Sequence, residues 1–128
     1  MKLLLDTHLL LWAAGQFKKL SNKTRSLIND TQNELLFSSA SLWEITIKNN
    51  LGRADFHADP HLLRRGLLDN GYVELPITSE HAVTVNDLPA IHKDPFDRIL
   101  IAQSIIEGVI LLTSDPVILK YSGPIRKA

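Results

Sequence analysis

The 128-residue chain contains no cysteine. Disulfide bonds and thiolate metal sites are therefore excluded, and the composition is compatible with a reducing cytoplasm. No stretch approaches the roughly 20 apolar residues that a membrane-spanning helix needs. The segment MKLLLDTHLLLW superficially resembles a secretory signal, but Asp6 and His8 interrupt its apolar run and no A-x-A-like cleavage site follows. We expect it to form a buried strand that continues into a helix.

An excess of either charge is also missing, because 14 lysine and arginine residues balance 14 aspartate and glutamate residues. Composition alone therefore does not indicate a nucleic-acid-binding protein. If four of the acids surrounded a metal ion, the other charged residues would have a net charge of +4. This value presupposes the metal site and does not support it. The phosphate-loop, GxGxxG and GxSxG motifs are absent, which removes the common nucleotide-binding and hydrolase interpretations. Five scattered histidines without an HExxH motif disfavour a zinc site.

What is present is an ordinary globular composition, with 45% hydrophobic and 22% charged residues, and residues 1–128 suit a single domain with its own core. Short apolar runs alternate with helical patterns. The predicted strands are Lys2–Leu5, Glu34–Ser39, Tyr72–Pro76 and Val109–Thr113, with an edge strand around Ile125. The predicted helices are Leu9–Ala14 closed by Gly15, Ser21–Asp30, Ser41–Asn50, Pro60 to Gly71, Ser79–Asp87, Pro95–Glu107 closed by Gly108, and a short one opened by Asp115-Pro116. This alternation predicts an α/β fold with a mostly parallel sheet of four to five strands and helices on both faces.

Chemistry in an open parallel sheet collects at the carboxyl ends of the strands. Four acids fall there: Asp6 directly after the first strand, Glu44 in the first turn of the helix after the second strand, Asp97 in the first turn of the helix before the fourth strand, and Asp115 just after the fourth strand. Because several helix N-termini open on the same edge, these carboxylates are expected to meet and to repel one another. A divalent cation compensates the repulsion, and oxygen ligands without cysteine or a histidine cluster suit Mg²⁺ or Mn²⁺ rather than Zn²⁺.

Each acid also has a purely structural interpretation. Asp6 and Asp115 are candidate helix caps. Asp97 would stand at the third helical position after an Asp94 cap and gain from the helix dipole. Glu44 would complete a capping box with Ser41 and would pair with Lys48 four residues later. A cap is common and contributes on the order of 1 kcal/mol, so only the four acids taken together favour a catalytic site.

The segment HKDPFDRILIAQ contains two acids with different expected roles. Asp94 precedes Pro95, which belongs at the first helical position, so Asp94 is the natural cap. Asp97 follows one turn later without an obvious structural partner. Adjacent Arg98 could pair with an acid elsewhere, and either Arg98 or a nearby lysine is a candidate phosphate contact.

Aromatic and basic residues give weaker signals. Trp12 and Trp43 each follow a leucine in a helical apolar pattern, which favours core packing over base stacking. The basic groups are expected on solvated faces, one of which would follow the phosphate backbone if the protein is a nuclease. These groups are Lys18, Lys19, Lys23 and Arg25, and Arg64 with Arg65.

Four segments, in order and nearly end to end, resemble the PIN-domain family and in particular its VapC-type toxins. They are LLLDTHLLLW, SLWEI, HKDPFDRILIAQ and LLTSDP. The family's acidic set falls on Asp6, Glu44, Asp97 and Asp115, none of which is missing, and Asp94 is an extra acid outside that set. The resemblance implies a three-layer α/β/α sandwich, Mg²⁺- or Mn²⁺-dependent cleavage of RNA, homodimerisation and inhibition by a small cognate antitoxin protein.

On this hypothesis Asp6 and Asp97 are the main metal ligands, and Glu44 and Asp115 complete the acidic pocket and help to position the attacking water. Two alternatives stay open. A phosphatase or receiver-like Mg²⁺-binding domain also places an aspartate after the first strand, although the phosphatase pattern expects a second one where this chain has His8, and a receiver expects paired early acids. A non-catalytic protein-interaction module would use the same acids only as helix caps.

Overall fold

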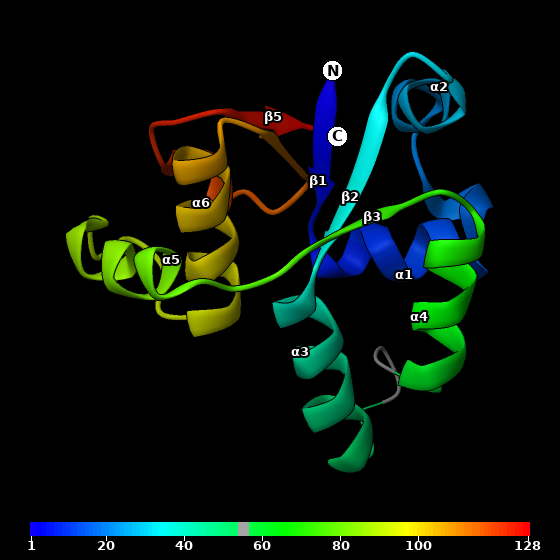
Figure 1. Cartoon of the computed structure of the whole chain (residues 1–128), viewed down its shortest axis with the longest axis horizontal. Helices are drawn as coiled ribbons and strands as arrows, with labels where there is room; N and C mark the ends of the chain where they lie inside the picture. The colour runs from blue at the N-terminus through cyan, green and yellow to red at the C-terminus, as the bar shows by residue number, and fades with distance from the viewer. Residues whose placement is uncertain (54–56) are drawn as a thin grey trace.

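A computed structural model describes residues 1–53 and 57–128 of the chain (Figure 1). Its centre is one sheet of five short strands in the order β3-β2-β1-β4-β5, and every neighbouring pair is parallel. The strands are β1 Lys2–Leu5, β2 Glu34–Ser38, β3 Val73–Leu75, β4 Ile110–Thr113 and β5 Ile125–Lys127. The predicted α/β class, the parallel sheet and the edge strand around Ile125 are confirmed.

Helices cover both faces of this sheet, which makes a three-layer α/β/α sandwich. The helices are α1 Thr7–Gly15, α2 Asn22–Asn29, α3 Ser39–Asn50, α4 Pro60–Asp69, α5 Ser79–Thr84 and α6 Pro95–Glu107, with 3₁₀ turns η1 Phe17–Lys19, η3 Val85–Asp87 and η4 Ile118–Lys120. Leu3 and Leu5 of β1 pack in a core cluster with residues of α1, α3 and α4. Leu4 points to the other face and packs with residues of α6 and η4. Burial on both faces explains why the KLLL run does not alternate in polarity.

Helix α6 begins and ends where the sequence indicates. The Asp94 side chain accepts hydrogen bonds from the backbone N–H groups of Phe96, at 2.8 Å, and Asp97, at 3.4 Å. Pro95 occupies the first helical position. Gly108 ends the helix with a φ of 66°, a left-handed conformation that favours glycine. The direction in which α6 presents Asp97 is therefore fixed by its own cap.

Several predicted element boundaries differ from the structure by one or two residues, and three further differences concern how a helix starts or ends. Gly15 lies inside α1, and Gln16 is the C-cap. Helix α3 starts at Ser39 because the Ser38 hydroxyl accepts from the Ala40 N–H at 3.0 Å, so Glu44 lies in the second turn and forms no capping box with Ser41. The predicted helix from 79 to 87 is α5 followed by the 3₁₀ turn η3. In α3 a neighbouring serine caps the helix before the expected one, and after α5 a tighter turn replaces the last helical turn.

The strand order decides where a site can form. The chain runs from β1 outward through β2 to β3 and then crosses to β4 on the other side of β1. In open parallel sheets, ligands bind outside the carboxyl ends of the strands at such a reversal, here between β1 and β4. A receiver domain has the order 2-1-3-4-5, so the observed order argues against that alternative. In the described part of the chain, no helix has the length and apolar character needed to cross a membrane.

Candidate active site

Asp6 follows β1 directly and is only 5% exposed. One carboxylate oxygen, Oδ1, accepts from the Leu9 N–H at 2.9 Å and caps α1. The other, Oδ2, accepts a hydrogen bond from the hydroxyl of Thr113, at the end of β4. Burial raises the pKa of Asp6 above the usual 3.8, against the opposing effect of the two hydrogen bonds. Asp6 is therefore a cap, as expected, and also a buried carboxyl group at the switch point.

Asp115 comes to the same place from β4. Its backbone N–H donates to the Thr113 hydroxyl at 3.0 Å, so one threonine connects Asp6 and Asp115. The Asp115 Oδ1 accepts from the Val117 N–H at 2.8 Å within a turn, but the predicted helix cap is wrong, because only the short η4 follows and its N-cap is Val117. The negative charge of Asp115 contributes to the raised pKa of Asp6, which means that the two carboxylates repel each other.

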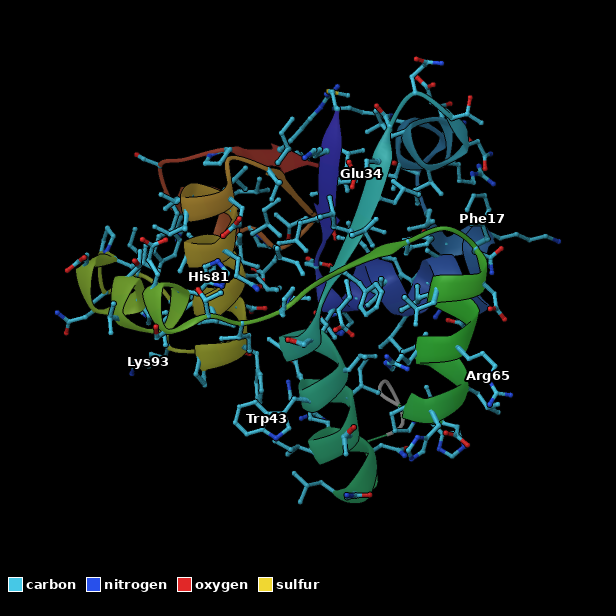
Figure 2. The ribbon with its side chains drawn as sticks, viewed as in Figure 1. Phe17, Glu34, Trp43, Arg65, His81 and Lys93 are labelled. Atoms are coloured by element: carbon cyan, nitrogen blue, oxygen red, sulfur yellow. The ribbon has the colours of Figure 1, made fainter. Side chains whose placement is uncertain are left out.

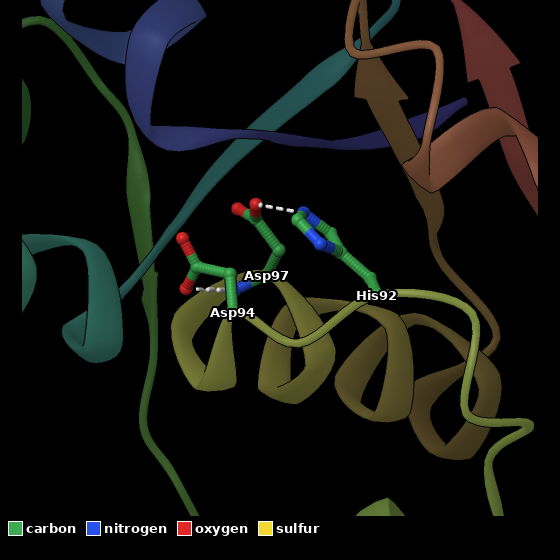
Figure 3. A group of neighbouring side chains, drawn as sticks. All are labelled: His92, Asp94 and Asp97. Carbon is green, nitrogen blue, oxygen red and sulfur yellow. Dashed lines mark hydrogen bonds and ion pairs between the residues drawn. The ribbon is translucent and has the colours of Figure 1, made fainter.

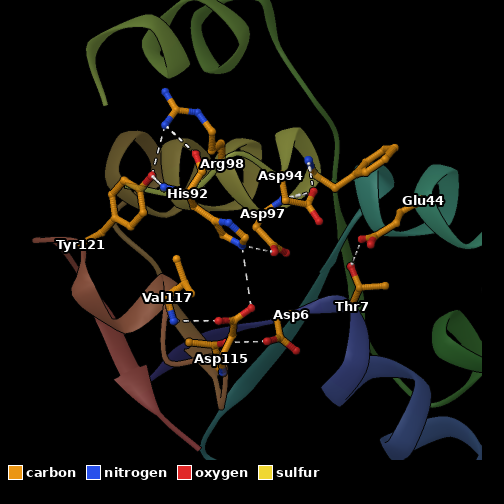
Figure 4. Close-up of polar contacts among 12 residues, drawn as sticks. Asp6, Thr7, Glu44, His92, Asp94, Asp97, Arg98, Asp115, Val117 and Tyr121 are labelled. Atoms are coloured by element: carbon orange, nitrogen blue, oxygen red, sulfur yellow. Dashed lines mark hydrogen bonds and ion pairs between the residues drawn. The ribbon is translucent and has the colours of Figure 1, made fainter. Parts of the chain in front are cut away.

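Asp97 approaches this edge from α6. Burial first, and then the charges of Asp94 and Glu44, raise the pKa of Asp97 to about 7 against the lowering effect of His92. The His92 ring Nε2 lies 2.8 Å from the Asp97 Oδ2 and 3.8 Å from the Asp115 Oδ2 (Figure 4). A single imidazole thus lies between two of the predicted acids.

Glu44 completes the group from α3 and is 3% exposed. Its Oε1 accepts from the Thr7 hydroxyl at 2.7 Å, and its Oε2 pairs with the Lys48 ammonium at 2.7 Å, as expected from the spacing of four. The Glu44 charge is one of those that raise the pKa of Asp97. All four predicted acids therefore lie at one edge, each linked by a hydrogen bond or by charge to another part of the group.

His92 is the member of this site that the sequence analysis missed. Its loop is held by Arg98, whose guanidinium donates to the carbonyls of Pro89 at 2.9 Å, Val85 at 2.9 Å and His92 at 3.3 Å. The Tyr121 hydroxyl accepts from the His92 N–H at 2.8 Å. The Arg98 guanidinium, one of the two candidates for a phosphate contact, thus holds this loop through its carbonyls. The only signal in the sequence was the crowding of charge in HKDPFD.

The donor set of this edge fits a hard divalent cation, because it consists mainly of carboxylate oxygens that repel one another. Over residues 1–53 and 57–128, the ligand atoms of His92, Asp94 and Asp97 form the one group found within 4.8 Å of one another (Figure 3). The most compact cluster thus includes Asp94, whose Oδ1 is already used as the α6 cap. Asp6, Glu44 and Asp115 surround that cluster.

The two tryptophans differ in a way that the sequence did not predict. Trp12 is half-buried against the core cluster, as expected, and the Lys19 ammonium lies 5.9 Å from its ring centroid. Trp43 was expected in the core as well, and this is wrong, because 61% of its surface is exposed. Trp43 directly precedes Glu44 on α3 (Figure 2), and its ring packs edge-to-face against that of Phe96, the residue before Asp97.

Two other surface features lie apart from the acids. Helix α2, which carries Lys23 and Arg25, lies towards the amino ends of the strands (Figure 1). A groove of about 1270 Å³ is lined by residues of α1, η1 and α4, and none of the four predicted acids lines it. The α2 basic group is therefore not part of the acidic edge.

Comparison with known proteins decides the family. Residues 3–124 match the PIN domain. The chain belongs to the PIN-domain family. PIN domains are generally nucleases that use divalent metal ions, so this membership supports a hydrolase that acts on nucleic acid. A search of curated proteins found no significant match.

Two solved structures show the PIN-domain fold over nearly the whole chain. One is the crystal structure of VapBC2 from Rickettsia felis bound to a DNA fragment from their promoter, with 14% sequence identity and a TM-score of 0.72 over 100% of this chain and 99% of that chain. The other is the crystal structure of DNA-bound VapBC from Salmonella typhimurium, with 15% identity and a TM-score of 0.70 over 99% of this chain and 98% of that chain. At these identities the similarity establishes the fold.

Proposed function

We propose that this PIN-domain protein is a Mg²⁺- or Mn²⁺-dependent endoribonuclease and the VapC-type toxin of a toxin–antitoxin pair. The observation that carries the proposal is the gathering of Asp6, Glu44, Asp97 and Asp115 at the carboxyl edge of β1 and β4. Mutual repulsion and burial raise the pKa of Asp97 to about 7 there, which is the situation that a bound cation relieves.

Asp6 and Asp97 are the proposed main ligands, and Glu44 and Asp115 are proposed to orient the attacking water. When bound, the cation would lower the pKa of that water and stabilise negative charge on the phosphodiester. Thr113 holds the Asp6 carboxylate by a hydrogen bond, and Thr7 holds the Glu44 carboxylate in the same way. Such hydrogen bonds restrict the rotation of a ligand and keep its oxygens aimed at the site.

A positive side chain that reaches phosphate is a further part of the proposal. Arg98 is committed to loop carbonyls, whereas Lys93 is exposed in the loop immediately before Asp94. Among the described residues, no hydrogen bond or ion pair is found for Lys93. We assign it the contact with the RNA backbone, which makes binding weaker as salt rises.

The proposed partners are a small cognate antitoxin and a second copy of the chain, with RNA as the substrate and the cytoplasm as the place of action. The two similar structures are of VapBC assemblies, which supports an antitoxin for this chain as well. The test is co-expression with each short reading frame next to its gene. A frame that restores growth and co-purifies with the chain supports the toxin role, and sedimentation of the isolated chain tests the dimer.

The catalytic assignment is tested with Asp6→Asn and Asp97→Asn. We expect each to reduce the rate of RNA cleavage by more than about 100-fold, because removing even an outer partner of a metal ligand costs about 10- to 100-fold. Asp69→Asn is the matched control, since it removes the same charge from an exposed position at the end of α4. Cleavage at the wild-type rate by correctly folded Asp97→Asn protein would exclude the assignment.

Thermal melting separates the enzyme from the non-catalytic interaction module. Millimolar Mg²⁺ or Mn²⁺ should raise the melting temperature of the wild-type chain, because a ligand that binds only the folded state stabilises it. The same ions should have little effect on a variant that combines Asp6→Asn, Glu44→Gln, Asp97→Asn and Asp115→Asn. An unchanged wild-type melting temperature would favour the module, in which the acids act only as caps.

A further inference from the structure

Trp43 is the most conspicuous exposed aromatic side chain near the acidic edge. The chain has only two tryptophans, and 61% of the Trp43 surface is open to solvent. Tryptophan is a residue that folded proteins bury to a large extent on average. The neighbouring Glu44 and Ile45 are both buried, so α3 is anchored by other residues while Trp43 points outward. Core packing therefore does not account for this side chain.

Phe96 holds the indole in place from α6. The two ring centroids lie 5.4 Å apart with an interplanar angle of 78°, an edge-to-face arrangement. In an edge-to-face pair, one ring covers at most one face of the other. Because 61% of the Trp43 surface is exposed, the indole keeps a face that is open to solvent. Figure 2 shows the Trp43 side chain extending from α3 towards the start of α6. The ring is thus exposed and at the same time restrained.

Both rings are tied to the acidic edge by the covalent chain. Trp43 precedes Glu44, and Phe96 precedes Asp97. The position of the ring pair relative to the carboxylates is therefore set by the helices that present the carboxylates. Phe96, which packs on Trp43, also donates its backbone N–H to the Asp94 carboxylate at 2.8 Å, so the ring pair adjoins the His92–Asp94–Asp97 cluster.

We propose that Trp43, braced by Phe96, is a stacking site for one unpaired nucleobase of the RNA whose backbone is cut at the acidic edge. This inference rests on the proposed ribonuclease function and adds a contact with one base of the substrate. A base in a duplex has both faces covered by its neighbours, whereas an unpaired base can stack on an aromatic side chain.

The charge of the protein gives stacking a role in binding. The formal net charge is zero and the proposed site is rich in carboxylates, so the general attraction for phosphate is weak. Stacking on an aromatic ring is worth on the order of a 5- to 150-fold change in affinity per base, and it does not depend on the sign of the local charge. A base on Trp43 would therefore retain a strand that the carboxylates repel.

A second copy of the chain is the competing occupant of this surface. A stable protein interface covers about 800 Å² on each partner, whereas one aromatic side chain contributes at most about 250 Å². The ring pair is small for a dimer contact and large enough for a base. The experiment below includes the oligomeric state, so that a dimer contact would be recognised.

The test compares Trp43→Phe, Trp43→Leu and Trp43→Ala in the full chain with a short single-stranded oligoribonucleotide. Leucine keeps an apolar side chain but has no aromatic face, and phenylalanine keeps a smaller one. We expect KM to rise about tenfold or more for the leucine and alanine variants and less for phenylalanine, with a smaller change in kcat. Trp12→Phe, at the half-buried tryptophan away from the acids, is the control and should keep the wild-type KM.

An abasic substrate locates the contact. Removing the base at one position relative to the cut should weaken binding to the wild-type protein about as much as Trp43→Ala weakens binding of the intact substrate. The Trp43→Ala variant should bind the abasic substrate almost as well as the intact one, because both changes remove the same contact. In the metal-free Asp97→Asn protein, the oligonucleotide should quench tryptophan fluorescence, and Trp43→Leu should abolish the quenching. This readout does not depend on cleavage.

Two results would overturn the inference while leaving the ribonuclease intact. One is a wild-type KM and unchanged quenching in Trp43→Leu. The other combines two observations: Trp43→Leu or Trp43→Ala sediments as a monomer where the wild type is a dimer, and the abasic substrate weakens binding equally in the variant and the wild type. That result would assign the surface to a second copy of the chain. If the wild-type chain neither binds nor cleaves RNA with Mg²⁺ or Mn²⁺, the proposed function fails together with the inference.

Discussion

The His92 ring Nε2 lies 2.8 Å from the Asp97 Oδ2, and this contact lowers the pKa of a carboxyl group that burial and neighbouring acids raise to about 7. The imidazole comes from a loop that Arg98 and Tyr121 hold through the backbone of His92. Among the residues that flank Asp97, His92 thus opposes the repulsion from Asp94 and Glu44.

Replacing His92 by alanine should therefore raise the pKa of Asp97 further in the metal-free protein. The reason is that the variant loses both the hydrogen bond and the favourable charge that stabilise the carboxylate. Carboxyl carbon NMR titration measures this value directly. His61→Ala, which removes an exposed histidine on α4, is the control. A pKa that falls in His92→Ala would contradict the arrangement.

Thr113 is fully buried and joins Asp6 to the backbone of Asp115. Thr113→Val keeps the shape but removes the hydroxyl, so an Asp6 oxygen loses its donor. We expect a loss of about 1–3 kcal/mol in the free energy of unfolding and a 10- to 100-fold loss in metal affinity or cleavage. Thr24→Val, at another fully buried threonine, should reduce stability without affecting metal affinity. Equal effects on metal affinity at the two sites would contradict a special role for Thr113.

Asp94 belongs to the compact His92–Asp94–Asp97 cluster, yet it is the cap of α6. Serine caps helices about as well as aspartate but carries no charge. Asp94→Ser should therefore keep stability and RNA cleavage near wild type, whereas Asp94→Ala should lose about 1 kcal/mol of stability. Chemical denaturation and cleavage rates measure both effects. A folded Asp94→Ser protein that has lost cleavage would make Asp94 a ligand and the proposed set incomplete.

The raised pKa of Asp97 also predicts how stability depends on pH in the metal-free protein. The unfolded chain has an Asp97 pKa near 3.8 and the folded chain about 7, so the folded state binds the proton more tightly. This contribution to stability is fully present below about pH 4 and is lost as the pH rises to about 7. The wild-type free energy of unfolding should consequently fall relative to that of Asp97→Asn across this window. A difference that stays constant with pH would contradict the shifted pKa.

The parts of the fold that depend on local pattern were predictable from the sequence. Fully apolar runs identified the buried strands, and Asp94-Pro95 with Gly108 fixed both ends of α6. The start of α3 was not predictable, because Ser38 competes with Ser41 as a cap and only the end of β2 decides between them. The four acids were found because helix caps and strand ends are local features that point to one edge.

The placement of His92 and of Trp43 depends on contacts that no local pattern contains. The loop of His92 is held by Tyr121, which is 29 residues away in the sequence. Trp43 follows the apolar spacing of a core residue, yet the crossing of α3 and α6 leaves its ring exposed against Phe96. Burial of one residue on a helix depends on which neighbouring helix packs there, and this is a tertiary property.

The most direct measurement is the chemistry of the RNA ends produced by purified wild-type protein with and without Mg²⁺ or Mn²⁺. If water held at Asp6, Glu44, Asp97 and Asp115 attacks the phosphorus, cleavage requires the cation, stops with a chelator and leaves no 2′,3′-cyclic phosphate. A substrate with a 2′-deoxy nucleotide at the cut should also be cleaved. Cleavage that continues in the chelator, or that leaves a cyclic phosphate, would contradict the account.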